Sequence, residues 1–152
     1  MRLFLLVVAL AAPALAQVEK VAMRTTGISC GVCAGLSEYY FKRIDGVDKV
    51  TISLSQESIA LTYKPGASFD PAGIRRILQS MEVGVTQFQI TAQGRVEEQG
   101  GKRFFVTGKS RFAVAPGGNA PSAGSPVTIE AILNDRLNPM EVKISNFKPL
   151  KQ

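Results

Sequence analysis

The order of alternating and helix-like segments between residues 18 and 90 limits this chain to few folds. Four segments alternate apolar and polar side chains, as strands with one buried face do, and they span residues 18–26, 50–54, 59–63 and 83–90. Two segments place apolar side chains at helical spacing, and they span residues 33–44 and 70–81. The order β-α-β-β-α-β predicts an α+β unit, with one antiparallel sheet and both helices on one face.

Residues at the ends of the predicted helices agree with this interpretation. Asp45-Gly46 follows the first helix, and glycine readily takes the left-handed conformation that ends many helices. Asp70 can cap the second helix and Pro71 suits its first position. The loop before the first helix is therefore the candidate functional site.

That loop and the first helical turn hold the two cysteines of the chain, Cys30 and Cys33, and the chain has no histidine. Cys33 falls in the first turn, where unpaired N–H groups and the helix dipole favour a thiolate. Two soft sulfurs suit Cu(I) or Hg(II), whereas zinc prefers four ligands. The same spacing also serves dithiol–disulfide exchange, so both kinds of chemistry stay open.

Residues 27–33 read Gly-Ile-Ser-Cys-Gly-Val-Cys, close to the Gly-Met-x-Cys-x-x-Cys signature of heavy-metal-associated domains, and Gly46-Val47 follows at the expected distance. Residues 18–91 therefore resemble that family, which includes periplasmic mercury-binding proteins and copper chaperones. The resemblance implies a ferredoxin-like fold and metal ligands Cys30 and Cys33. It also implies a non-enzymatic carrier whose partner is a membrane metal transporter.

The chain departs from the family pattern at several positions near the cysteines. Ile28 replaces the methionine that packs beneath the loop, and we expect it to fill a similar volume. Val83 stands where the family has an aromatic side chain or lysine over the metal. Ser37 and Tyr40 replace apolar and small residues, and we expect Tyr40 to widen the buried stripe of the helix. Glu38 matches an acidic position of the family.

Residues 92–152 predict a second, small all-β domain, such as an oligonucleotide/oligosaccharide-binding barrel. Its predicted strands are 89–97, 103–107, 111–115, 127–133 and 140–144. Residues 116–126 are rich in Pro, Gly, Ala and Ser and predict a flexible loop. The predicted core residues of this part are Val127, Ile129, Met140, Val142 and Ile144. Because residues 92–152 hold no cysteine or histidine, we expect the domain not to bind the metal.

The N-terminus has the features of a signal peptide. Arg2 precedes the apolar run from Leu3 to Ala12, and Ala14-Leu15-Ala16 is a small-x-small cleavage site. The run is shorter than the roughly 20 residues of a membrane span. We therefore predict a signal peptide over residues 1–16, a mature domain over 17–91, and a periplasmic or secreted protein that does not span the membrane after cleavage.

The remaining candidate residues are expected to pack in the core or to face solvent. The methionines Met23, Met81 and Met140 are expected to pack in cores. Arg75-Arg76 is expected on a solvated helix face. Phe104, Phe105 and Phe112 lie among basic residues, but in an exported protein we expect core aromatics and no nucleic-acid partner. A net charge of +6 is too modest to specify a partner.

The predicted function is that of an exported carrier or scavenger of one soft ion, Cu(I) or Hg(II), bound by Cys30 and Cys33. We expect a monomer, or a dimer bridged by metal through a second pair of sulfurs. The alternative is a thiol–disulfide exchange protein with Cys30 as nucleophile.

Overall fold

The computed structural model describes residues 16–28 and 30–150. Its helices are α1 (Gly31–Lys42) and α2 (Pro71–Gln79). Its strands are β1 (Val18–Thr26), β2 (Val47–Ser53), β3 (Ser58–Tyr63), β4 (Gly84–Gln99), β5 (Lys102–Thr107), β6 (Ser110–Val114), β7 (Val127–Asn134) and β8 (Glu141–Pro149). The predicted signal peptide lies almost entirely outside the described residues.

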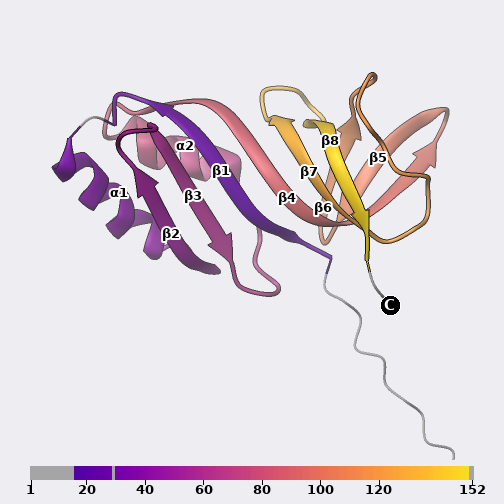
Figure 1. Ribbon diagram of the computed structural model, residues 1–152, viewed down its shortest axis with the longest axis horizontal. Coiled ribbons are helices and arrows are strands. Elements are labelled where there is room, and N and C mark those ends of the chain that lie inside the picture. Colours follow the sequence, from indigo (N-terminus) through magenta and orange to yellow (C-terminus); the bar gives the residue numbers. More distant parts are fainter. Residues whose placement is uncertain (1–15, 29, 151–152) are drawn as a thin grey trace, which may run out of the picture.

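The first half of the chain has the predicted β-α-β-β-α-β order. Its strands lie in the order β2-β3-β1-β4 and are antiparallel throughout. Both helices cover the same face of this sheet (Figure 1). The alternating residues of β1 point into the core between the layers, where Val21 and Met23 are almost fully buried beside Phe41 of α1 and Leu78 of α2. The α+β, ferredoxin-like arrangement of this half is confirmed.

β4 is one strand of 16 residues, whereas the sequence predicted separate strands over 83–90 and 89–97. The alternation of buried side chains continues without a break from Phe88 to Val96, so nothing ends the strand. Gly94 does not interrupt it, because the Val106 carbonyl oxygen approaches so closely that a Cβ at position 94 would collide with it. The predicted domain boundary after residue 91 therefore falls inside a strand that both halves share.

The second half closes into a ring of five strands, in the order β4-β5-β6-β8-β7 and back to β4. β6 and β8 run parallel and the other neighbours are antiparallel. β7 pairs with residues 88–94 of β4, so the barrel covers the edge of the first sheet. The predicted core residues Val127, Ile129, Val142 and Ile144 are buried, and Met140 is half-buried against the core.

Residues 116–126, predicted to form a flexible loop, follow the barrel surface and are attached to it by hydrogen bonds. Asn119 N–H donates to the Ile144 carbonyl at 3.0 Å and Gly124 N–H to the Val96 carbonyl at 2.8 Å. The Arg103 guanidinium donates to the carbonyl of Pro121, a buried residue. Composition alone did not reveal these attachments.

The expectation that Arg75 and Arg76 both face solvent is correct for Arg76 and wrong for Arg75. The Arg75 guanidinium donates to both carboxylate oxygens of Asp135, at 2.6 and 2.8 Å, and to the Val85 carbonyl at 3.0 Å. It also lies 4.9 Å from the ring centroid of Phe88. Asp135 follows β7, so Arg75 joins helix α2 to the barrel.

Neither helix in the described part of the chain has the length and apolar character needed to cross a bilayer.

Candidate metal-binding site

Cys30 and Cys33 are brought together by the start of α1. The helix begins at Gly31, two residues earlier than predicted, because Cys30 acts as its N-cap: the Cys33 N–H donates to Cys30 Sγ at 3.1 Å. The two Cα atoms are 5.4 Å apart and the sulfurs are joined as a disulfide. Sequence reasoning missed this start because cysteine is not among the usual capping residues. Both sulfurs therefore meet at one point.

The start of α1, which carries the cysteine pair, lies at the end of the molecule farthest from the barrel (Figure 1). Cys30 is exposed and Cys33 is half-buried against the core. Val32, between them, is 74% exposed. An ion or a partner thiol could reach the sulfurs from solvent without any movement of the fold.

The loop that carries Cys30 is supported from below and from one side. Ile28 is fully buried, as predicted for the residue that replaces methionine. Gly27 has a φ of +88°, and a Cβ there would lie 3.2 Å from the Glu82 carbonyl oxygen. The turn between α2 and β4 therefore packs directly against the loop. Val83 of this turn is itself buried, so it packs inside the protein instead of covering the sulfurs.

Ser37 links the first turn of α1 to the same α2–β4 turn. Its side chain is fully buried, and Ser37 Oγ donates to the Cys33 carbonyl at 2.7 Å. Met81 Sδ lies 3.8 Å from the same hydroxyl oxygen. Met81 is half-buried and packs against the core, in agreement with its predicted packing role. A third sulfur thus lies close to the cysteine end of α1.

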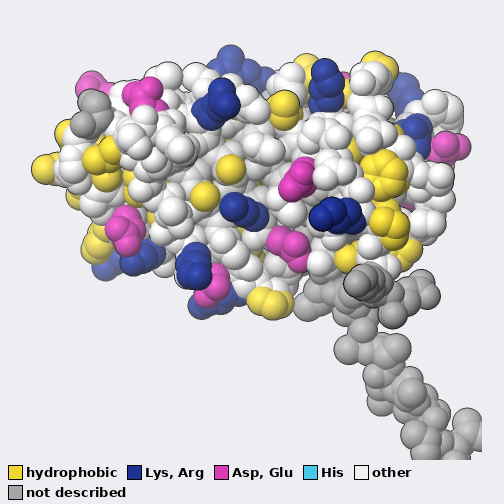
Figure 2. Space-filling view, in the orientation of Figure 1, with side chains coloured by type: hydrophobic (Ala, Val, Ile, Leu, Met, Phe, Trp, Pro, Cys, Tyr) yellow, Lys and Arg dark blue, Asp and Glu magenta, His cyan; other side chains and the backbone are white. Residues whose placement is uncertain are grey.

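Exposed apolar side chains continue from the cysteine pair along the surface of α1. Val32, Leu36, Tyr39 and Tyr40 are all exposed, and Figure 2 shows apolar side chains gathered at this end of the molecule. The expectation that Tyr40 widens the buried stripe is wrong, since Tyr40 is 45% exposed. It packs edge-on against Tyr39 on the outer face of the helix. This surface is available to a partner that reaches the sulfurs.

The donor set at this site is small. Among residues 16–28 and 30–150, no three His, Cys, Asp or Glu side chains are arranged to hold a metal ion together. The pair of sulfurs therefore suits a soft ion of low coordination number better than zinc, which takes four ligands in structural sites.

Comparison with known proteins finds a similar curated protein. A copper-exporting P-type ATPase of Staphylococcus saprophyticus is 32% identical to this chain over 59 residues, which are 39% of the chain and 7% of the ATPase. The chain thus spans only a small part of that relative. No protein-family model matches the chain.

Three solved structures are similar to part of this chain. The yeast copper transporter domain Ccc2a has 21% identity and a TM-score of 0.39, and covers 44% of this chain and 90% of its own. The CopZ metallochaperone has 19% identity and a TM-score of 0.40, with 44% and 98% covered. A copper-binding domain from HMA7, a P-type ATPase, has 19% identity and a TM-score of 0.38, with 44% and 92% covered.

The resemblance of residues 18–91 to heavy-metal-associated domains is confirmed. In this part of the chain, the β-α-β-β-α-β order and the position of the C-x-x-C pair at the start of α1 agree with the resemblance.

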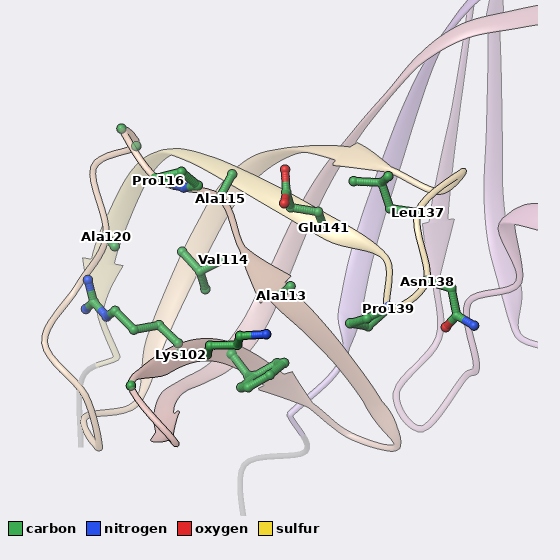
Figure 3. Close-up of a pocket in the computed structure, with 15 residues that line it drawn as sticks. Lys102, Ala113, Val114, Ala115, Pro116, Ala120, Leu137, Asn138, Pro139 and Glu141 are labelled. Carbon is green, nitrogen blue, oxygen red and sulfur yellow. The ribbon is translucent and has the colours of Figure 1, made fainter.

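A groove of about 670 Å³ lies on the barrel and not on the first half of the chain. Its lining comes from β5, β6, the start of β8 and the loops after β4, β6 and β7. Lys102 and Glu141 are the charged residues labelled in Figure 3, among mainly apolar neighbours such as Val114, Leu137 and Pro139. Because neither cysteine lines it, the groove is separate from the candidate metal site.

Proposed function

We propose that this protein is an exported carrier or scavenger of one soft metal ion, Cu(I) or Hg(II), held between Cys30 and Cys33. The observation that carries the proposal is the convergence of both sulfurs at the start of α1, with one cysteine exposed. The first-turn N–H groups and the dipole of α1 favour negative charge on these sulfurs, so the reduced pair is suited to bind as thiolates.

The bound ion is the cargo of the protein. Two thiolates satisfy a soft, low-coordinate ion, and a partner's thiolate can attack it from the exposed side, so that one metal–sulfur bond forms as another breaks. The exposed apolar side chains of α1 around the sulfurs suit docking of such a partner. A membrane metal transporter is the proposed acceptor, supported by the similarity to a segment of a copper-exporting ATPase.

Export to the periplasm or the medium is part of the proposal and is supported by the n-region, apolar run and cleavage site at the N-terminus. In an oxidising compartment the sulfurs form the disulfide that the structure contains. Loading then requires a dithiol reductant that delivers two electrons and two protons, or metal binding before oxidation. A second copy of the protein could supply two more thiolates and form a metal-bridged dimer.

The second candidate function is thiol–disulfide exchange, favoured by the disulfide itself and by the exposure of Cys30. The Cys33 N–H that donates to Cys30 Sγ would stabilise a Cys30 thiolate. In this reaction Cys30 attacks a partner disulfide, and Cys33 then displaces the partner thiol to re-form the Cys30–Cys33 bond.

We further propose that the second half is a barrel of the oligonucleotide/oligosaccharide-binding type. Its ring order, its single parallel pair of β6 and β8, and a long first strand that pairs at both ends support this assignment. Because β7 pairs along the second edge of β4, the barrel also prevents this edge from pairing with a strand of another molecule.

The two candidate functions are separated by measuring the disulfide reductase activity of the protein and its metal content after export. The carrier function predicts co-purification of Cu(I) or Hg(II) when the growth medium supplies the ion, with no catalysed reduction of a protein disulfide such as that of insulin. Catalysed reduction by a protein that never carries metal would reject the carrier function and support exchange.

A further inference from the structure

We propose that Met81 supplies a third sulfur ligand to a Cu(I) ion held by the Cys30 and Cys33 thiolates. This inference rests on the proposed carrier function, and it chooses Cu(I) as the ion that the complete site favours. Soft thiolate and thioether sulfurs are typical ligands of Cu(I).

The position of Met81 relative to Cys33 carries the proposal. Ser37 stands one helical turn after Cys33, so the two side chains share a face of α1. Met81 Sδ lies 3.8 Å from Ser37 Oγ, and this oxygen is 2.7 Å from the Cys33 carbonyl oxygen. The thioether therefore lies against α1 beside the turn between Cys33 and Ser37.

The side chain of Met81 is able to move to the ion. It is half-buried, and three rotatable bonds precede its methyl group, so it can reorient at low cost. Helical side chains lean toward the helix N-terminus, which directs this face of α1 toward the cysteines. The backbone that carries Met81 is fixed, since Met81 N–H donates to the Leu78 carbonyl at 3.0 Å and the next residue, Glu82, packs against Gly27.

The other described methionines do not have this position. Met23 is 1% exposed at the centre of the first core, and Met140 lies in the barrel, far along the molecule from the cysteines. Both therefore serve as controls. Ser37 contacts the thioether in the disulfide form and is not itself proposed as a ligand.

The test uses the purified, reduced protein with its methionines replaced by selenomethionine, loaded with one equivalent of Cu(I). X-ray absorption at the selenium edge detects a copper neighbour of selenium directly. The proposal expects a Cu–Se contact in the wild-type protein and in Met23→Leu, and its loss in Met81→Leu. Leucine conserves the volume of methionine, so the fold is expected to be kept.

The affinity for Cu(I) gives a second readout. Met81→Leu should weaken it by at least about 10-fold, the size that loss of even an outer-shell partner produces, while Met23→Leu leaves it unchanged. If the wild-type protein binds Cu(I) tightly without any Cu–Se contact, Met81 is not a ligand, although the carrier function stands. If the wild-type protein binds no Cu(I), both the Met81 ligand and the Cu(I) carrier function are rejected.

Discussion

The substitution Asp135→Asn tests whether Arg75 joins the two halves of the molecule. It removes the charge that the Arg75 guanidinium contacts at 2.6 and 2.8 Å while keeping the size of the side chain. The Arg75 side chain is 27% exposed and that of Asp135 is 9% exposed. Breaking one side of a buried pair costs about 3–5 kcal/mol, and an exposed pair contributes about 0.2–1 kcal/mol. This pair lies between these limits, so we expect a loss of about 2 kcal/mol.

Thermal unfolding followed by circular dichroism measures this loss. For a chain of this size, 1 kcal/mol shifts the melting temperature by about 2–4 °C, so Asp135→Asn should lower it by about 4–8 °C. The matched control is Glu38→Gln, which removes the same charge from an exposed i,i+4 pair with Lys42 on α1. That pair should contribute about 0.3–0.5 kcal/mol. Equal shifts for the two variants would refute the reasoning.

The pH dependence gives an independent check on the same pair. The hydrogen bonds from Arg75 lower the pKa of Asp135 below its ordinary value, outweighing the effect of its burial. A carboxyl whose pKa is lowered on folding contributes stability that is fully present above its unfolded pKa of about 3.9 and is lost as the pH falls through the folded value. The stability difference between the wild-type protein and Asp135→Asn should therefore be constant near neutral pH and shrink in acid.

Four further predictions concern the metal site and the shared strand. Cys30→Ser and Cys33→Ser should each weaken Cu(I) binding by more than the roughly 10–100-fold that loss of an outer-shell partner causes. The circular dichroism spectra of both variants should stay native. An affinity near that of the wild-type protein in either variant would contradict a two-thiolate site. Cu(I) affinity should fall as the pH drops from about 8 to 5, because protons compete for thiolates, and a flat profile would argue against thiolate coordination. A chain ending at Ala92 should self-associate in gel filtration, because β4 loses its β7 partner; a stable monomer would show that the first half folds alone. Gly94→Ala should lower stability by about 1–3 kcal/mol through its collision with the neighbouring strand, whereas Gly35→Ala, with open space at its Cβ, should raise it by roughly 0.5–1 kcal/mol in a melting experiment.

Local patterns were sufficient to predict the first half of the fold. The Asp70-Pro71 start of α2 and the alternation in β1 and β3 act within a few residues, and the structure follows them. The cysteine loop was found in the same way, from a short motif between a strand and a helix. The capping role of Cys30 was missed because a sulfur acceptor is rare at helix starts.

Interactions between distant residues could not be predicted in this way. Nothing near Arg75 indicates that a carboxylate 60 residues later will bind it. Likewise, the continuity of β4 depends on β7 and β5 pairing along it, and the outward turn of Tyr40 depends on Ser37 filling the buried side of α1. These features depend on which segments meet in the folded protein, and a single sequence does not record that.

The Cu(I) dissociation constant of the protein, measured by competition with a Cu(I)-specific chromophoric chelator before and after reduction, tests the central claim most directly. The carrier function predicts that the reduced protein removes one equivalent of Cu(I) from the chelator and that the disulfide form removes none, because oxidation takes both thiolates from the ion. Failure of the fully reduced protein to compete, or equal competition by the reduced and disulfide forms, would contradict a Cu(I) site formed by Cys30 and Cys33.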